Sequence, residues 1–367
     1  MARIDIVCSV VDNFGDAGFC WRLARQLARE HRIGVRVWTD RQDLFERLAR
    51  GDEPARAAAL DLAHAGIEVG PIEALDACIE PGQFVVTLFD ARLPASFAAR
   101  LRARSPNPPE VHVEYLSAEP WIDACHGLHS LRTDGSIAWM FLPGFSAASG
   151  GLVREHDLDR RRECFLASHK HAWLARAGVS SDARIATLFA YPDAPIQDWL
   201  EALGREGGWT VLAAAGGSPF PTGRHRVSGV EVIALPFLAQ PAFDELLWAS
   251  DFAFVRGEDS WIRAHWARIP FVWAPYRQSD RLHLKKLDAF LDRFLDASAA
   301  DDPASAAAIR AVSHAWSEDG DIDQAWRAYR ERLESIAALH RVWTDTLAAR
   351  TDLASNLMTM LRSRANC

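Results

Sequence analysis

Residues 4–27, which read IDIVCSVVDNFGDAGFCWRLARQL, decide the fold of the first half of the chain. Residues 4–11 are largely apolar and β-branched, which is typical of a buried strand. Gly15 and Gly18 end this run, and a helical pattern follows in which Leu23 and Leu27 lie one turn apart. A strand, a glycine turn and a helix in this order predict the first unit of a parallel sheet covered by helices.

The same alternation continues along the chain and then restarts. Further strands are predicted in the first half at 34–38, 84–89 and 111–116, and in the second half at 184–190, 209–215, 230–235, 252–255 and 271–273. Two successive α/β halves predict two Rossmann-like domains that face a cleft, with ligands bound at the carboxyl ends of the strands. The expected domains are residues 1–175 and 176–344, with a charged helical connector near 155–177. A C-terminal helix at 345–367 is expected to pack back on the first domain.

Composition excludes several classes of protein. The chain has 367 residues and a net charge of −8, which argues against non-specific nucleic-acid binding. Its six cysteines are scattered without zinc spacing, so we expect reduced thiols. No signal peptide or membrane-spanning run is present, and a cytoplasmic protein without membrane contact is expected. The 14 tryptophans are expected mainly in cores, the alternative being a recognition surface.

The first candidate site is Asp12-Asn13-Phe14-Gly15-Asp16, at the end of the first predicted strand and directly before a helix. This is the preferred ligand position in α/β sheets, and two carboxylates bracket its glycine turn. Each acid also has a structural interpretation. Asp16 could cap the N-terminus of the helix. Asp12 could accept a hydrogen bond from the backbone of its own turn.

The second candidate site is Arg256-Gly257-Glu258-Asp259-Ser260, again between an apolar strand and a helix. Its backbone N–H groups and the helix dipole suit a phosphate, and an arginine can hold a diphosphate with two prongs. The alternative is a capping motif with a surface ion pair.

The third candidate group, Phe237 and Gln240 with Tyr191, offers aromatic faces and an amide to a nucleobase, although core packing explains the aromatics equally well. The stretch Gly216-Gly217-Ser218-Pro219 has no following Lys-Ser or Lys-Thr and is dismissed as a phosphate-binding P-loop.

At these motifs the chain resembles a known family, the bacterial protein-arginine rhamnosyltransferases of translation elongation factor P (the EarP family). The resemblance covers nearly the whole length in the same order. It is carried by 10–16 with 20–27, 143–145 with 150–152, Pro236-Phe237 with Gln240, 247–248, 254–260, 270–273 and 286–290. The segment Trp273-Ala274-Pro275-Tyr276 departs from the family pattern after its first residue, so no donor contact is assigned there.

The resemblance implies a GT-B fold and an inverting transfer of rhamnose from dTDP-β-L-rhamnose to an arginine of elongation factor P. This modification would activate the factor for rescue of ribosomes stalled at polyproline. Neither metal nor another cofactor is implied. The resemblance assigns donor contacts to Phe14, Gly15, Tyr191, Phe237, Gln240, Arg256, Gly257, Glu258, Asp259 and Ser260. Glu258 would also lie near the reaction centre, and Asp12 and Asp16 would receive the acceptor arginine.

The chemistry of the residues agrees with such a reaction. A guanidinium is a poor nucleophile because its lone pairs are delocalised and it stays protonated. One carboxylate must orient its N–H groups and another must take a proton as the C–N bond forms. We hypothesise that Asp16 is the base and Asp12 the orienting group, and the reverse order stays open. The alternatives are the same fold acting on another acceptor, and a nucleotide-sugar-binding protein without turnover.

Overall fold

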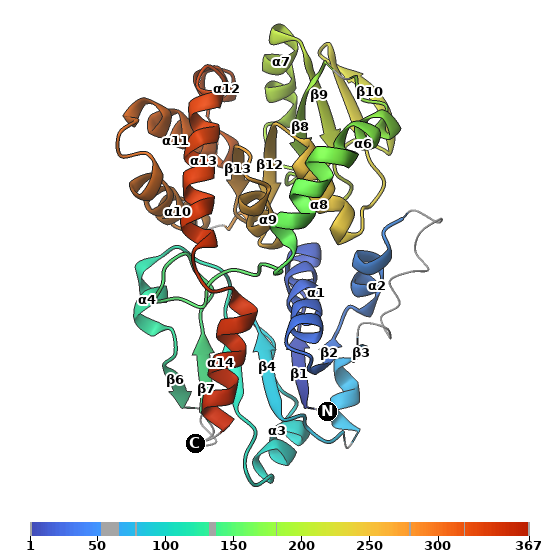
Figure 1. Cartoon of the computed structure of the whole chain (residues 1–367), viewed down its shortest axis with the longest axis vertical. Helices are drawn as coiled ribbons and strands as arrows, with labels where there is room; N and C mark the ends of the chain where they lie inside the picture. The colour runs from blue at the N-terminus through green and yellow to red at the C-terminus, as the bar shows by residue number, and fades with distance from the viewer. Residues whose placement is uncertain are drawn as a thin grey trace. The chain divides into compact units, whose positions relative to one another are not determined.

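The computed structural model describes residues 2–52, 66–77, 79–131, 137–180, 182–278, 280–318 and 320–365. The chain forms two compact units (Figure 1). The first comprises Met1–Arg50, Pro54–His156 and Arg350–Cys367, and the second comprises Gly51–Glu53 and Asp157–Ala349.

The first unit is built on a seven-stranded sheet of order β3-β2-β1-β4-β5-β7-β6, parallel except for the terminal β6–β7 pair. Its strands are β1 (Arg3–Cys8), β2 (Gly34–Thr39), β3 (Ile67–Pro71), β4 (Phe84–Leu88), β5 (Glu110–Val113), β6 (His129–Leu131) and β7 (Ile137–Phe141). Its helices are α1 (Asn13–Glu30), α2 (Gln42–Arg50), η3 (Ile72–Asp76), α3 (Ala95–Arg102), α4 (Pro120–Cys125) and α14 (Leu353–Ala365).

The first strand ends earlier than the sequence predicted, at Cys8 instead of Val11. The backbone N–H groups of Val10 and Val11 donate to the carboxylates of Asp40 and Asp16, at 3.0 and 2.8 Å, and not to a neighbouring strand. Val11 is 67% exposed, so its β-branched side chain does not belong to the core. Beyond the end of the strand, carboxylates therefore accept the backbone hydrogen bonds that a neighbouring strand would otherwise accept.

The second unit contains a six-stranded sheet of order β10-β11-β9-β8-β12-β13. Its strands are β8 (Arg184–Leu188), β9 (Trp209–Ala213), β10 (Gly223–Val227), β11 (Val230–Ala234), β12 (Phe252–Arg256) and β13 (Phe271–Ala274). Its helices are α5 (Leu158–Cys164), η4 (Phe165–His169), α6 (Lys170–Ala177), α7 (Ile196–Glu206), α8 (Gln240–Ala249), α9 (Asp259–Ala267), α10 (Leu282–Ser298), α11 (Pro303–Ser317), α12 (Ile322–Arg330) and α13 (Leu333–Ala348).

The connector predicted near 155–177 is helical, and from Asp157 onward it belongs to the second unit. Phe165 anchors it there, because its ring packs on Trp173 and Trp248 with centroids 6.4 and 5.7 Å apart. The first unit thus ends at His156, which is 19 residues before the predicted boundary at 175. An apolar anchor inside a charged segment is the reason for this difference.

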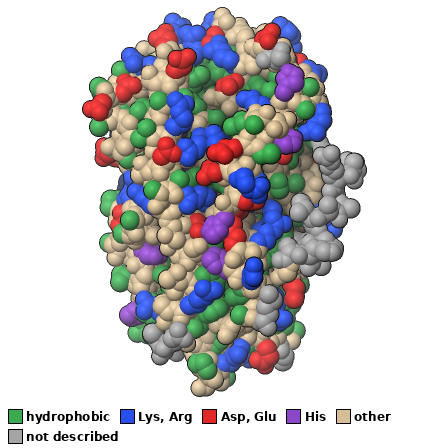
Figure 2. All heavy atoms as spheres, viewed as in Figure 1, with side chains coloured by type: hydrophobic (Ala, Val, Ile, Leu, Met, Phe, Trp, Pro, Cys, Tyr) green, Lys and Arg blue, Asp and Glu red, His purple; other side chains and the backbone are tan. Residues whose placement is uncertain are grey.

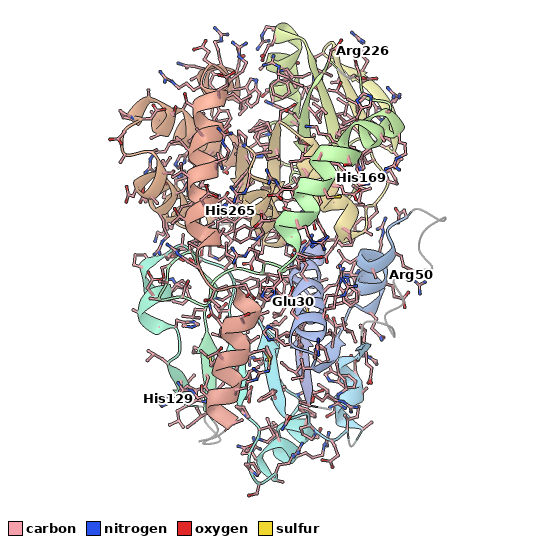
Figure 3. The ribbon with its side chains drawn as sticks, viewed as in Figure 1. Glu30, Arg50, His129, His169, Arg226 and His265 are labelled. Atoms are coloured by element: carbon pink, nitrogen blue, oxygen red, sulfur yellow. The ribbon has the colours of Figure 1, made fainter. Side chains whose placement is uncertain are left out.

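The last helix, α14, belongs to the first unit and lies beside α1 (Figure 1). The buried amide of Gln26 on α1 donates to Asp352 at 2.9 Å, just before α14, and also to Glu30 at 2.8 Å. Glu30, labelled in Figure 3, accepts in addition from the backbone of His156 at 2.8 Å. This polar network joins α1 to both chain segments that leave the unit.

Most of the described tryptophans are core residues, as the sequence predicted. In the second unit Trp199, Trp316 and Trp326 surround Phe254, and Trp316 stacks on it at 3.5 Å. Trp261 and Trp273 stack at 3.6 Å with an interplanar angle of 6°. On the surface, the face shown in Figure 2 carries basic and acidic side chains intermixed.

The described cysteines Cys8, Cys20, Cys125 and Cys164 are free, in agreement with the sequence prediction, and Cys78 and Cys367 lie outside the described residues. No described helix is long and apolar enough to cross a membrane.

Candidate functional site

The turn between β1 and α1 carries the first candidate site. Asp12 is the N-cap residue of α1, but its side chain makes no capping hydrogen bond. Instead its backbone carbonyl accepts from the N–H of Gly15 at 2.7 Å. A Cβ atom at Gly15 would lie 2.7 Å from Oδ2 of Asp12, so glycine leaves the space that this carboxylate occupies. The ring of Phe14 lies beneath the guanidinium of Arg47 on α2, at 5.8 Å.

Asp16 lies in the first turn of α1, and its two carboxylate oxygens have different surroundings. Oδ2 accepts from the backbone N–H groups of Val11 and Asp12, both at 2.8 Å. Oδ1 is buried and accepts no hydrogen bond from any residue that the structure describes. Through Oδ2 the side chain therefore caps the turn that precedes the helix. Oδ1 takes no part in this capping and has no hydrogen bond among the described residues.

Burial raises the pKa of Asp16 from 3.8 to about 6. The residue is only 1% exposed, and desolvation disfavours its charged form. The two backbone hydrogen bonds oppose this shift, and the nearby charges of Asp12 and Asp90 add to it. A carboxylate with such a pKa is a stronger base than an ordinary aspartate and is still largely ionised at neutral pH.

The second candidate site lies at the carboxyl ends of the parallel strands of the other sheet. Arg256 is the last residue of β12, and its guanidinium covers the rings of Phe189 and Tyr191 at 4.8 and 4.5 Å. It also donates to the backbone carbonyl of Gly216, in the loop after β9. These contacts hold the cation at the edge where ligands bind in this class of sheet.

Phe189 and Gly216 were not among the predicted site residues. The dismissed stretch Gly216-Gly217-Ser218-Pro219 is not a P-loop, but it contributes this carbonyl. A Cβ at Gly217 would lie 2.4 Å from the ring of Phe189, so the glycine lets the loop pass against that ring. The signal that the sequence offered was a glycine pair directly after a buried strand.

The turn after β12 is held closed by Ser260. Its hydroxyl donates to the carbonyl of Arg256 and accepts from the N–H of Arg256 at 3.1 Å. Gly257 has a left-handed φ of 62°, and its carbonyl accepts from Nε1 of Trp273 at 3.0 Å. Glu258 is the N-cap residue of α9. Ser260 thus shapes the loop that presents the helix N-terminus, and its hydroxyl is engaged with the backbone.

Gln240 and Asp259 lie together at the starts of α8 and α9. The amide nitrogen of Gln240 donates to Oδ2 of Asp259 at 3.3 Å. Phe237 and Tyr191 are nearly buried, at 7% and 9% exposure, and the rings of Tyr191 and Tyr276 meet edge to face with centroids 5.7 Å apart. The acid therefore orients the amide that was predicted to contact a nucleobase.

A buried ion pair that the sequence did not indicate fixes α8 against α9. Arg263 donates to both carboxylate oxygens of Asp244, at 2.9 and 2.8 Å, and both side chains are 1% exposed. Such a two-pronged pair has high geometric specificity. It sets the distance between the helix that begins at Gln240 and the helix that begins at Asp259.

The structure thus gathers the predicted residues into two groups, one in each unit. Asp12, Phe14, Gly15 and Asp16 lie at one sheet edge, and Tyr191, Phe237, Gln240, Arg256, Gly257, Glu258, Asp259 and Ser260 lie at the other. In the described part of the chain, no three His, Cys, Asp or Glu side chains are grouped so that they could hold a metal ion.

Two doubly wound units, each with polar side chains where its parallel strands end, form the GT-B fold, which is typical of enzymes that act on nucleotide sugars. The S. aureus MnaA–UDP co-structure shares this fold, with 11% identity, a TM-score of 0.52 and coverage of 98% of this chain and 95% of that chain.

More specific relatives define the family. The model of the Elongation-Factor P (EF-P) rhamnosyltransferase EarP matches residues 4–362. A protein-arginine rhamnosyltransferase of Pseudomonas putida is 38% identical over 99% of both chains, and one of Neisseria meningitidis is 31% identical over 78% of both. A solved structure described as the structural basis for EarP-mediated arginine glycosylation of EF-P is 30% identical, with a TM-score of 0.67 over 99% of both chains. The chain belongs to the EarP family of glycosyltransferases.

Proposed function

We propose that the chain transfers L-rhamnose from dTDP-β-L-rhamnose to an arginine side chain of translation elongation factor P, with inversion at the anomeric carbon. The observation that carries this proposal is the buried carboxylate of Asp16, which has one unused oxygen, a pKa of about 6 and a second acid, Asp12, beside it. Paired acids suit a cationic acceptor, and the family relatives are named for an arginine substrate.

The different surroundings of the two Asp16 oxygens support Asp16 as the base and Asp12 as the orienting group. Oδ2 of Asp16 already accepts two backbone N–H groups, so Asp16 cannot form the forked pair in which each carboxylate oxygen accepts one N–H of a guanidinium. It suits the role of base, which needs a single oxygen and a raised pKa. Asp12 then orients the guanidinium with its carboxylate over Gly15. Because Oδ1 is buried, a neighbouring side chain has to move before the acceptor reaches it.

In the proposed step, a terminal nitrogen of the arginine attacks C1 of the rhamnose. The bond from C1 to the diphosphate oxygen breaks and its electron pair leaves with dTDP, while a proton of the attacking nitrogen passes to Asp16. Arg256 and the N-terminus of α9 supply positive charge to the leaving diphosphate, so that no metal is required. Tyr191, Phe237 and Gln240 would contact the thymidine, and Glu258 would lie close to the sugar. An enzyme that modifies a translation factor would act in the cytoplasm.

The test is a transfer reaction with purified components. The protein is incubated with dTDP-rhamnose and elongation factor P, and the factor is analysed by mass spectrometry and peptide mapping. We expect a gain of one deoxyhexose on a single arginine, with α configuration by NMR, in the presence of a chelator. An unmodified factor, or modification of a residue other than arginine, would refute the proposal. Asp16→Asn is the matched inactive control.

A further inference from the structure

The carboxyl edge of the first sheet carries more acids than the predicted pair. The strand registers place Thr39, Cys8, Leu88 and Val113 in one row across β2, β1, β4 and β5. Acids follow the end of each of these four strands: Asp40 after β2, Asp12 and then Asp16 in the first turn of α1 after β1, Asp90 after β4, and Glu114 after β5. Neighbouring strands lie about 4.8 Å apart, so this is a band of carboxylates centred on β1 and β4.

The outer members of this band already have partners. Asp40 accepts from the backbone of Val10 at 3.0 Å. Glu114 lies 3.4 Å from Nε2 of His112 and accepts from the N–H of Tyr115 at 3.1 Å. Asp90 differs, because it is exposed and its carboxylate makes no hydrogen bond or ion pair with any described residue.

Buried aromatic residues fix the position of Asp90. Phe89, directly before it, is 1% exposed and has a left-handed φ of 57°. Its ring stacks on Tyr115 at 4.3 Å with an interplanar angle of 14°, and its N–H donates to Val113 at 2.8 Å. The N–H of Ala91 then donates to Leu88 at 3.0 Å, which closes the turn. Asp90 is thus held at the end of the strand adjacent to β1.

An unpartnered buried oxygen in this band points to a ligand. Asp16 is nine-tenths buried or more, and its Oδ1 is left without a hydrogen bond among the described residues. The negative charges of Asp12 and Asp90 also repel the charge of the Asp16 carboxylate. A cation with several N–H donors would satisfy the free oxygen and offset this repulsion.

We propose that Asp90 is a third acceptor-binding residue, whose carboxylate accepts from the guanidinium of the acceptor arginine beside Asp12 and Asp16. This inference rests on the proposed function. A guanidinium carries five N–H donors, of which Oδ1 of Asp16 can accept at most two and Asp12 a forked pair. At least one donor is left for a carboxylate from the neighbouring strand.

The test compares Asp90→Asn with Asp90→Glu and with a control of equal charge change. Glu68, an exposed acid on β3 in the same unit, supplies the control Glu68→Gln. For each protein, kcat and the KM values for elongation factor P and dTDP-rhamnose are measured at low and high salt and from pH 5 to 8. Thermal unfolding establishes that each variant is folded.

We expect Asp90→Asn to raise the KM for the factor roughly tenfold, the loss expected for one charge-assisted hydrogen bond, and to leave the KM for the donor unchanged. The salt dependence of the acceptor KM should weaken, and the acidic limb of kcat/KM should move to lower pH because one charge near Asp16 is gone. Asp90→Glu should recover most of the acceptor affinity, and Glu68→Gln should behave as wild type.

An unchanged acceptor KM in a folded Asp90→Asn protein would overturn the inference, whatever happens to the pH profile. So would a loss that Glu68→Gln reproduces, since it would reflect net charge alone. If Asp90→Asn fails to fold, Asp90→Ser takes its place, and an unchanged acceptor KM in that folded variant would likewise count against a direct contact. A wild-type protein that modifies no arginine would instead refute the proposed function, and is recognised without any variant.

Discussion

The substitution Asp16→Asn is expected to make the protein more stable at neutral pH while it strongly reduces turnover. In the folded protein the carboxyl group has a pKa of about 6, against 3.8 in the unfolded chain. The difference of 2.2 units corresponds to about 3 kcal/mol at 1.36 kcal/mol per unit. Because the folded state binds the proton more tightly, the wild type loses this stability as the pH rises from about 4 to above 6.

Asparagine keeps the shape of the side chain, and its amide oxygen can accept the same two bonds from Val11 and Asp12. The variant has no charge to bury, so its free energy of unfolding should exceed that of the wild type by at most about 3 kcal/mol at pH 7.5 and match it near pH 4. Turnover should fall by roughly 10²–10⁴, the usual contribution of a positioned base.

Urea unfolding at several pH values between 4 and 8 measures the difference, and Glu68→Gln serves as a control that should show no such dependence on pH. The reasoning is refuted if Asp16→Asn is less stable than the wild type at pH 7.5, or if the difference between them does not change with pH. Either result would mean that burying the charge of Asp16 does not lower the free energy of unfolding.

Three further outcomes follow from the geometry. Gly15→Ala should reduce turnover at least tenfold in the transfer assay, because its Cβ would lie 2.7 Å from Oδ2 of Asp12 and displace that carboxylate. Arg263→Met should destabilise the chain by about 3–5 kcal/mol in urea unfolding, because it leaves Asp244 buried and unpaired, and adding Asp244→Leu should recover much of the loss. Burial lowers the pKa of His340 from 6.5 to about 3, so stability should fall as the pH drops below 6.5, and His340→Phe should flatten this fall in unfolding experiments between pH 7 and 4.5.

The strands that sequence patterns predicted are those with buried side chains on both faces. β4 and β9 are buried at every position and read as continuous apolar runs. Four strands, β3, β6, β7 and β10, were not predicted. Three of them lie at sheet edges, where β6 is exposed throughout, β10 has no buried residue and β3 has one, while β7 lies beside β6 and is buried at only two of its five positions. Their pairing is decided by the neighbouring strand, which a local pattern does not contain.

For the site, the order strand, glycine, helix located Asp12–Asp16 and Arg256–Ser260, because this order determines where a sheet ends and its ligands bind. The roles inside each turn depend on hydrogen bonds that spacing does not reveal. Ser260 bonds the backbone of its own turn, and Asp259 orients Gln240. This order did not indicate Asp90, because only the register of β4 beside β1 brings it near Asp16.

A comparison of two buried acids on β1 and α1 shows why burial alone does not mark the functional one. Asp5, at the opposite end of β1, is fully buried and accepts from Arg36 at 2.6 and 2.8 Å, from Nε1 of Trp38 at 2.9 Å and from the N–H of Gly82 at 2.6 Å. Both of its oxygens are satisfied, so it has a structural part in the sheet. Asp16 is as deeply buried, yet one oxygen has no partner among the described residues. An unsatisfied buried carboxylate is costly, and a cationic acceptor bound to it would offset that cost. The incomplete hydrogen bonding of Asp16, and not its burial, is therefore what supports the proposal that the arginine binds at this sheet edge.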